Sequence, residues 1–485
     1  MGVVASQSFK NIVSTYLGFA MGAINTLFLY TEFLSDAYYG MVGYMLSLAY
    51  VLMPIMSFGV HNTLVKFYSA FKTRTSLNSF LTLMLFLPLA VIIPLIAITY
   101  ISSDVIVGFL AQKNDIIGGY LWHTIFAAIA LAYFEVFFAW VKVQMQTVFG
   151  NFMKEVFHRA ATMILLFLLY LEVIDVDQFM LGLVIVYLLR TLIMKVYAFS
   201  IKLPIITFKS LNNLTAILKY SFLIIIAASV ATILLDVDKV MLGYYVEIEQ
   251  IAYYNVAIFI AAVIAVPQRS MHQILMPLSA KYLNERDFDS LEDLYKRSSL
   301  NLLIVGGLIF LLILTNINQL YFLIPEQFGG GLFVVFVIGL SKLFDAALGS
   351  NNAILFNSDY YRMVLALGVF LAVLMILLNI VFIPWLGING ASLATLFAVF
   401  LYNSIKLYVV YNKLKIFPFT IKTLKVVVLI WASVLALYFW EFPFNPLVNI
   451  VLKSLLGSLI YLFAVYRFNF SEDLSFLAKK YFKLK

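Results

Sequence analysis

"SDAYYGMVGYMLSLAYVLMP" (residues 35–54) and "EQIAYYNVAIFIAAVIAVP" (residues 249–267) share one pattern. In each stretch a Tyr-Tyr pair opens a long apolar run, and a proline, Pro54 or Pro267, lies late in that run. The recurrence predicts an internal repeat in which both copies begin with the same kind of helix. Two-lobed repeats are typical of membrane transporters, in which the lobes enclose a central cavity.

Apolar residues dominate the whole chain. Hydrophobic residues make up 64% and charged residues 12%, whereas soluble domains have about 45–50% and about 25%. Because a helix needs roughly 20 apolar residues to cross a bilayer, the sequence predicts an all-α polytopic membrane protein with fourteen transmembrane helices. The predicted spans are 12–34, 40–61, 79–101, 117–141, 155–172, 179–200, 217–235, 250–275, 299–317, 331–353, 362–383, 389–411, 423–440 and 446–466.

The spacing of the repeat predicts how the spans are grouped. Six spans separate the two copies, an even number, so both halves enter the membrane in the same direction. This predicts two six-helix lobes related by an axis along the membrane normal, with two further helices added at the C-terminal end. The predicted boundaries are 1–211 for the first lobe, 212–415 for the second lobe, and 416–485 for the two added helices and a tail.

Basic residues in the links between spans predict the orientation. The links that join even to odd spans carry Lys66, Lys72, Arg74, Lys142, Lys154, Arg159, Lys202, Lys209, Lys219, Lys281, Arg286, Lys296, Arg297, Arg362, Lys406, Lys413, Lys415, Lys422 and Lys425. The other links carry only Lys113, Lys239 and Lys453. Since Lys and Arg are enriched on the cytoplasmic side, we expect both termini to be cytoplasmic.

Composition also argues against several kinds of protein. A net charge of +8 would suggest nucleic-acid binding in a soluble protein, but here membrane topology and anionic headgroups explain the cations. The chain has no cysteine, and its four histidines are scattered without metal-ligand spacing. We therefore expect no metal, no cofactor and no nucleic-acid partner.

Charged residues inside the predicted spans are the candidate functional residues, because a mid-bilayer cation costs about 2.5–3.5 kcal/mol on insertion scales and usually faces a cavity or a partner. Arg190 shares one face of the sixth span with Tyr187, and no acid lies one turn away. Lys342 shares a face of the tenth span with Asp345 and Asn352. One central cation per lobe could hold an anionic substrate, although Lys342 could equally pair with Asp345.

Four further residues are weaker candidates. Glu135 could carry a coupling proton, or bond to a neighbouring helix as a structural carboxylate. Lys142 could line the cavity or extend to the interface. Arg269 could receive substrate or anchor a helix at the membrane surface. Asn25 belongs to a small and polar stripe on the first span, which could serve helix packing or line a hydrated cavity.

Two Asp-x-Asp sequences raise an enzymatic alternative. Asp175-Val176-Asp177 and Asp236-Val237-Asp238 resemble the acidic pairs that hold a metal in some glycosyltransferases. Both lie at external ends of helices, where carboxylates are commonly solvated, and neither follows the first span. The short external links leave no room for a large catalytic loop. We therefore expect no enzymatic activity.

Two longer stretches carry a family resemblance. "SDAYYGMVGYMLSLAYVLMPIMSFGVHNTLVKFY" (35–68) and "LLDVDKVMLGYYVEIEQIAYYNVAIFIAAV" (234–263) resemble the openings of the two lobes of Wzx-type polysaccharide biosynthesis (O-antigen) flippases. These belong to the multidrug/oligosaccharidyl-lipid/polysaccharide (MOP) superfamily, which includes lipid II flippases and multidrug exporters. The resemblance extends over nearly the whole chain as fourteen spans in two lobes, and it implies a MATE/MOP-like fold.

The resemblance also implies a function. It implies movement of an undecaprenyl-pyrophosphate-linked oligosaccharide from the cytoplasmic to the periplasmic leaflet of a bacterial inner membrane, for lipopolysaccharide or other surface polysaccharide assembly. The implied partners are the lipid-linked oligosaccharide, membrane lipids and other polysaccharide assembly proteins. The alternatives are a multidrug or cation antiporter of the same superfamily, which cavity carboxylates would favour, and a membrane glycosyltransferase or polymerase.

Overall fold

The chain forms α-helices joined by short turns. The computed structural model describes residues 3–208, 211 and 213–473, and no β-strand occurs among them. Lys209 and the predicted lobe boundary at residue 212 lie outside the described residues. By its internal contacts the chain divides into two compact units, Met1–Asn255 and Val256–Lys485. The expected all-α fold is confirmed.

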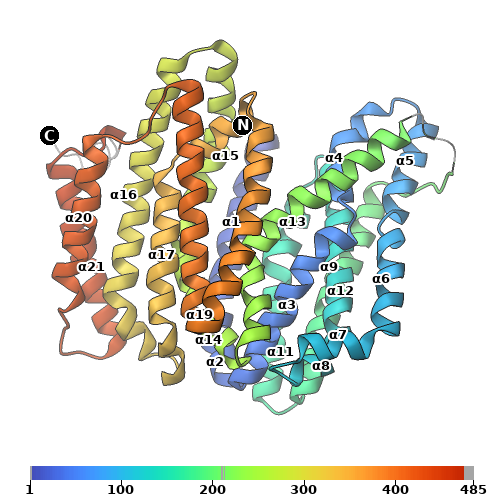
Figure 1. The fold of residues 1–485 in the computed structure, drawn as a ribbon, viewed down its shortest axis with the longest axis horizontal. Helices are drawn as coiled ribbons and strands as arrows, with labels where there is room; N and C mark the ends of the chain where they lie inside the picture. The colour runs from blue at the N-terminus through green and yellow to red at the C-terminus, as the bar shows by residue number, and fades with distance from the viewer. Residues whose placement is uncertain (1–2, 209–210, 212, 474–485) are drawn as a thin grey trace. The chain divides into compact units, whose positions relative to one another are not determined.

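The first unit contains the helices that carry most of the candidate site (Figure 1). They are α1 (Val3–Ile24), α2 (Tyr30–Phe33), α3 (Asp36–Met56), α4 (Val60–Phe67), α5 (Arg74–Phe86), α6 (Leu89–Ile101), α7 (Ser103–Leu110), α8 (Ile116–Gly119), α9 (Leu121–Lys142), α10 (Val148–Phe152), α11 (His158–Tyr170), α12 (Val176–Ile201) and α13 (Leu214–Tyr245), with π-helical segments η1 (Asn25–Leu29) and η3 (Met153–Phe157) and a 3-10 turn η2 (Tyr68–Ala70).

The second unit continues in the same manner. Helix α14 (Glu249–Ala262) contains the boundary between the units. It is followed by η4 (Val263–Ala265), α15 (Val266–Glu285), α16 (Phe288–Tyr321), η5 (Glu326–Gly331), α17 (Leu332–Ala347), α18 (Asn351–Asn357), α19 (Tyr361–Leu414), α20 (Ile421–Tyr438) and α21 (Pro446–Arg467).

The number of membrane crossings depends on three irregular helices. Among the described residues, eleven helices are long and apolar enough to cross a membrane, or twelve if the bent helix α13 is one span. The run Val148–Tyr170 carries Lys154, Glu155 and Arg159, so it is too charged to qualify by composition. If that run also spans and α19 spans twice, the count becomes the fourteen predicted from the sequence.

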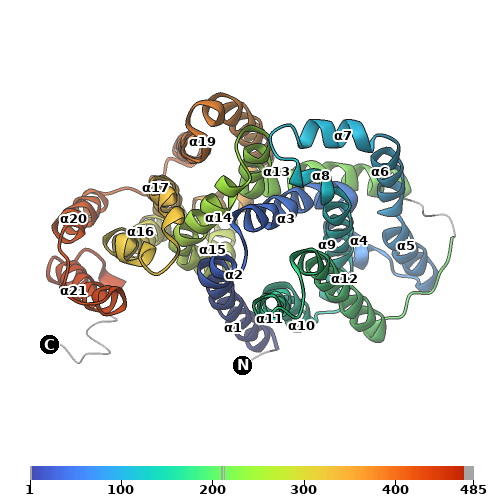
Figure 2. The same ribbon diagram turned by 90° about the horizontal axis from the view of Figure 1, so that it is seen from below.

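Helix α19 turns back on itself. Its 54 residues would extend about 81 Å if straight, far beyond a hydrocarbon core of about 30 Å. The turn occurs at Gly387, where φ is 55° and ψ is −130°, a conformation that essentially only glycine adopts. At Gly390 a Cβ atom would lie 2.1 Å from the carbonyl oxygen of Phe382. Both glycines therefore permit the hairpin whose arms run side by side in Figures 1 and 2.

Helix α13 packs within the first unit, so this unit extends beyond the predicted lobe boundary. The turn between α3 and α4 has Gly59 at φ 63°, where a Cβ would lie 2.5 Å from the carbonyl oxygen of Ser221 on α13. The Ser221 hydroxyl also bonds to Thr63 over 2.8 Å. The division into two six-helix lobes with two added helices stays a prediction.

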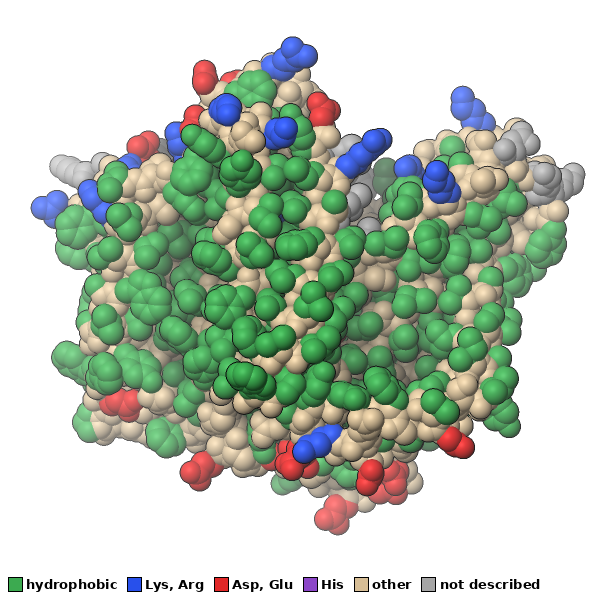
Figure 3. Space-filling model, in the orientation of Figure 1, with side chains coloured by type: hydrophobic (Ala, Val, Ile, Leu, Met, Phe, Trp, Pro, Cys, Tyr) green, Lys and Arg blue, Asp and Glu red, His purple; other side chains and the backbone are tan. Residues whose placement is uncertain are grey.

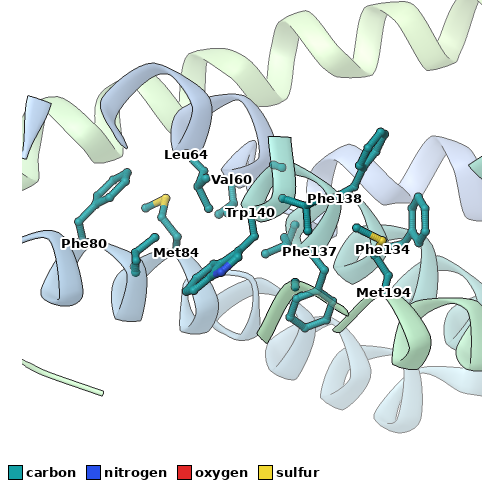
Figure 4. Packing of buried hydrophobic residues seen from close by; sticks show 14 of the residues in the cluster. Val60, Leu64, Phe80, Met84, Phe134, Phe137, Phe138, Trp140 and Met194 are labelled. Atoms are coloured by element: carbon teal, nitrogen blue, oxygen red, sulfur yellow. The ribbon is translucent and has the colours of Figure 1, made fainter. Parts of the chain in front are cut away.

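A hydrophobic cluster fixes α9 within the first unit. Trp140, fully buried, packs among Val60, Phe80 and Met194, which come from three other helices (Figure 4). Its indole nitrogen donates to the carbonyl oxygen of Lys202 over 3.1 Å, so the polar atom of this buried ring is paired. The cluster holds α9 against α12, and these two helices carry Glu135 and Arg190.

In the second unit α16 is the central helix. It contacts α17, α20 and α21, and Gly307 lets α20 approach closely, since a Cβ there would lie 2.3 Å from Ile430. The Tyr461 hydroxyl of α21 donates to the carbonyl oxygen of Ile304 over 3.1 Å. The two C-terminal helices are therefore packed onto this unit.

The surface of each unit has the polarity of a membrane protein. Figure 3 shows hydrophobic side chains across the middle of the visible face of each unit, with Lys and Arg mostly at the upper edge and Asp and Glu at both edges. Exposed apolar side chains such as Leu192 (53%) and Leu459 (68%) confirm that the helices are built to face lipid.

Candidate functional site

Arg190 is a buried cation in the middle of α12. Only 2% of the residue is exposed. Its guanidinium carbon lies 4.1 Å from the centroid of the Phe134 ring and 4.9 Å from that of Tyr187. His158 on α11 adds an electrostatic interaction with Arg190, and its ring lies 5.7 Å from that of Tyr187. Two aromatic rings thus cover the cation, the His158 ring lies beside Tyr187, and the sequence-predicted pair of Arg190 and Tyr187 is brought together.

No carboxylate neutralises Arg190 within the described part of the chain. It takes part in none of the ion pairs found there, and its Nε has no hydrogen-bond partner among the described residues. Cation–π contacts contribute about 0.5–2 kcal/mol, less than the several kcal/mol that desolvating an ion costs. A buried cation with so little compensation can attract an anion strongly.

A second charged group lies on α9 and η3, and its carboxylate, Glu135, follows Phe134 in the sequence of α9. The Lys154 ammonium donates to Glu135 Oε1 over 2.5 Å, and the two side chains are 43% and 14% exposed. Glu135 also interacts electrostatically with Lys142 and His61. Arg159 pairs with Glu155 over 3.5 Å.

Positive charge prevails in the group of Arg190, Lys142, Lys154, Arg159, Glu135 and Glu155, which we call the basic cluster. It contains four cations and two carboxylates, and both carboxylates are already paired with cations. The charge pattern counts Lys154 and Arg159 among the link cations, although Arg159 lies within the predicted span 155–172. The structure places both residues in a helical run that begins at residue 148 rather than 155, so Lys154 is also helical.

Two π-helical segments meet at the basic cluster. Asn25 lies in η1, is 4% exposed and donates to the carbonyl oxygen of Arg159 over 2.9 Å. At Gly18 a Cβ atom would lie 2.4 Å from the carbonyl oxygen of Glu155, so α1 packs directly on η3. π-helical turns occur frequently at functional sites. The small and polar stripe of the first span therefore lies at a close helix contact, and Asn25 bonds across the helix pair. That the stripe also lines a hydrated cavity stays a prediction.

A separate polar group lies in the second unit. Lys406 of α19 is 1% exposed, donates to Asn352 Oδ1 over 2.9 Å, and lies 4.4 Å from the centroid of the Tyr402 ring. Asp345 interacts electrostatically with Lys406 and accepts a hydrogen bond from Asn403 over 3.2 Å. The charge pattern of the sequence places Lys406 among the link cations. Its position within the predicted span 389–411 is the signal that it could be buried.

Two predicted cations are more accessible. Lys342 on α17 is half-buried, and Arg269 on α15 is exposed. Lys142, exposed at the end of α9, lies 4.0 Å from the ring centroid of Phe138. The joint action of Arg190 and Lys342 on one anion remains a prediction.

The first Asp-x-Asp sequence has structural partners. Asp175 caps α12 by accepting from the Gln178 backbone over 2.7 Å, a common helix-starting arrangement. Asp177 accepts from the Tyr120 hydroxyl over 2.5 Å. Both carboxylates therefore stabilise the start of α12.

The second Asp-x-Asp sequence is likewise bonded to the protein. Asp236 accepts from Ser47 over 3.0 Å and from Lys239 over 3.1 Å. Asp238 accepts from the Tyr254 hydroxyl over 2.8 Å. Within the described part of the chain no group of three or more His, Cys, Asp or Glu residues could hold a metal ion.

Comparison with known proteins gives a fold likeness. No protein-family model matches the chain, and no curated protein matches it. A solved structure of the lipid II flippase MurJ in an inward closed conformation matches with a TM-score of 0.74 and 17% identity, over 96% of this chain and 100% of that one.

Other solved structures match with lower TM-scores. An inward-facing MATE multidrug resistance transporter of the MOP superfamily has a TM-score of 0.61 and 12% identity, over 84% of this chain and 94% of that one. A MOP superfamily transporter from Pyrococcus furiosus has a TM-score of 0.53 and 12% identity, over 84% and 96%. The chain thus has a MurJ/MATE-like fold, as expected, while membership of the MOP superfamily and of the Wzx-type family stays a prediction.

Proposed function

We propose that this protein is a flippase that moves a lipid-linked oligosaccharide, carried on a polyprenyl pyrophosphate, from the cytoplasmic to the periplasmic leaflet of a bacterial inner membrane. The observation that carries the proposal is the basic cluster in the first unit. Four cations face two carboxylates there, and Arg190 is buried without an ion-pair partner among the described residues. The excess charge suits a pyrophosphate, which carries its negative charge on several oxygens.

The accessible part of the basic cluster supports entry of a polar substrate. The Lys154 side chain is 43% exposed and that of Arg159 is 26% exposed, and both belong to the helical run Val148–Tyr170. Charged side chains at such positions usually face a hydrated cavity rather than lipid. Lys154 and Arg159 would contact the pyrophosphate first. Arg190, buried against the Phe134 and Tyr187 rings, would then attract it electrostatically.

The likeness in fold to MurJ supports a lipid-linked substrate, because MurJ is a flippase of lipid II. The likeness to MATE transporters keeps a multidrug antiporter as the second candidate. A drug cation would need an available carboxylate, whereas Glu135 is already paired with Lys154. The basic cluster therefore favours an anionic substrate over a cationic one.

A deletion strain tests the function. We expect complete lipid-linked repeat units to accumulate on the cytoplasmic leaflet while surface polysaccharide disappears, because a flippase acts after assembly and before polymerisation or transfer. A multidrug antiporter would leave surface glycan intact and raise sensitivity to cationic drugs. A glycosyltransferase or polymerase would leave a truncated or unpolymerised product. Complete surface polysaccharide in a strain with no second flippase would refute the proposal.

A further inference from the structure

Helix α12 has two apolar grooves on its outer side. The larger, of about 810 Å³, lies between α12 and the helices α5, α6 and α9, and its lining includes Leu189, Leu192 and Lys195. The smaller, of about 410 Å³, lies between α12 and α10 and also includes Leu192. Leu192 is 53% exposed and lines both grooves. A ridge of α12 thus separates two neighbouring grooves.

The larger groove is apolar and long enough to hold an acyl chain of one lipid leaflet. Along α12 it extends from Ile185 to Phe199, roughly 21 Å at 1.5 Å per residue, compared with about 15 Å for half of a hydrocarbon core. Its walls are almost entirely aliphatic and aromatic. Toward the end of α12 that precedes Lys202, Lys195 lies against the Phe199 ring, with its ammonium 5.8 Å from the ring centroid.

Lys195 marks the end at which a charged headgroup would lie. It is exposed and precedes the last residue of α12, Ile201, by six residues, roughly 9 Å. A lysine at this depth extends its ammonium to the interface while its stem stays in apolar surroundings. Beside the second groove, Ser200 adds a hydroxyl at the same end of the helix.

The grooves are separate from the basic cluster. The Thr191 hydroxyl donates to the carbonyl oxygen of Ala130 over 2.7 Å and joins α12 to α9. Arg190 lies beyond this contact, against Phe134 and Tyr187. A lipid tail in the larger groove would therefore not belong to a pyrophosphate held at Arg190.

We propose that the two grooves bind one anionic glycerophospholipid of the adjoining leaflet, with an acyl chain on each side of the α12 ridge and its phosphate at Lys195. The occupant is a resident lipid rather than transported cargo. It would fill the space between α12 and the helices α5 and α6, which is otherwise open to the membrane. The proposal does not depend on the proposed transport function.

Photoactivatable phospholipids in proteoliposomes test the site. The full-length protein is reconstituted with phosphatidylglycerol or phosphatidylcholine that carries a diazirine on one acyl chain, and labelled peptides are mapped by mass spectrometry. We expect phosphatidylglycerol to label peptides around residues 129–137 and 185–200 more strongly than phosphatidylcholine does. Equal labelling by both lipids would overturn the assignment of an anionic headgroup.

Matched variants separate the groove from general contact with lipid. Leu189→Trp fills the larger groove and should reduce labelling there, whereas Leu181→Trp should not, since Leu181 is similarly exposed on the same helix but lines neither of these two grooves. Unchanged labelling in Leu189→Trp would overturn the proposal. If that variant does not insert, the exposed Lys195 provides an independent test.

Charge removal at Lys195 tests the headgroup. Lys195→Gln should lower phosphatidylglycerol labelling about fivefold, the ratio that corresponds to about 1 kcal/mol per lysine near an anionic surface. Lys72→Gln, at an exposed lysine in the link before α5, is the control and should have no effect. Displacement of the probe by a polyprenyl phosphate would show that the groove holds the substrate's tail, and would refute a resident phospholipid.

Discussion

The guanidinium carbon of Arg190 lies 4.1 Å from the centroid of the Phe134 ring. The contact joins α12 to α9 and brings the mid-span cation to the helix that carries Glu135. Because the aromatic faces stabilise the cation without neutralising it, its charge remains available to an anion. Arg190 is therefore the residue at which a change should affect transport most.

We predict that Arg190→Ala reaches the membrane in normal amounts but loses glycan export, and that Arg190→Lys retains part of it. Lysine keeps the charge but lacks the planar guanidinium, which can donate hydrogen bonds to two phosphate oxygens at once. Surface glycan measured per molecule of membrane protein checks this, with Lys72→Gln as the control. Normal export by a well-expressed Arg190→Ala would remove Arg190 from the mechanism.

Variants of the Lys154–Glu135 pair should distinguish its role in stability from its role in transport. Removing either charge alone leaves the other unpaired and should lower the unfolding temperature, by an amount corresponding to about 1 kcal/mol because the 43% exposed Lys154 is screened by water. The double variant Lys154→Met, Glu135→Gln should recover most of this stability. Export should stay impaired in the double variant, since the cation is lost. Recovery of both properties together would mean that the pair is purely structural.

Acid should weaken the attachment of the segment after α21. The side chain of Arg297 bonds to Asp473 and holds the pKa of that carboxyl below its ordinary value of 3.8, with Asn301 as a second donor. A carboxylate with a lowered pKa stabilises the fold above the unfolded value, and the stabilisation is lost as pH falls through the folded value. The unfolding temperature should therefore fall less between pH 7 and pH 3 in Asp473→Asn than in the parent protein. An identical acid response in both would contradict the prediction.

The orientation can be tested with single cysteines, because the chain has none of its own. Ser103→Cys, at the start of α7, should react with an impermeant thiol reagent in intact spheroplasts. Lys72→Cys, on the basic side, should react only after permeabilisation; Ser210, predicted for the same side, lies outside the described residues. The opposite result would reverse the predicted topology.

Long apolar runs allowed most helices to be predicted within a few residues. The predicted spans 117–141 and 179–200 correspond to α9 (Leu121–Lys142) and α12 (Val176–Ile201). Such runs are visible in sequence because apolar composition over about 20 residues is itself the requirement for crossing a bilayer. The helical hairpin at Gly387 also lies between two predicted spans.

The sequence pattern does not predict contacts between segments that lie far apart in the chain. In the sequence Glu135 lies in the predicted span 117–141 and Lys154 at the end of the link that follows it. Only the packing of α9 against η3 shows that the two residues pair. Lys406 lies near the end of a predicted span, and its burial depends on Asn352 from another helix. Predicted site residues could be chosen by depth and charge, but their partners follow from tertiary packing.

The last prediction concerns the two mid-span cations, one in each unit. If Arg190 and Lys342 bind the same pyrophosphate, removing one charge already disrupts the site, so the second removal should add little. Export rates of Arg190→Gln, Lys342→Gln and the double variant, measured at equal membrane abundance, give the interaction energy of a double-mutant cycle. We expect the double variant to lose clearly less than the product of the two single losses. Losses that multiply within error would show that the two cations act independently, and the shared-anion hypothesis would then be abandoned while each residue kept its own role.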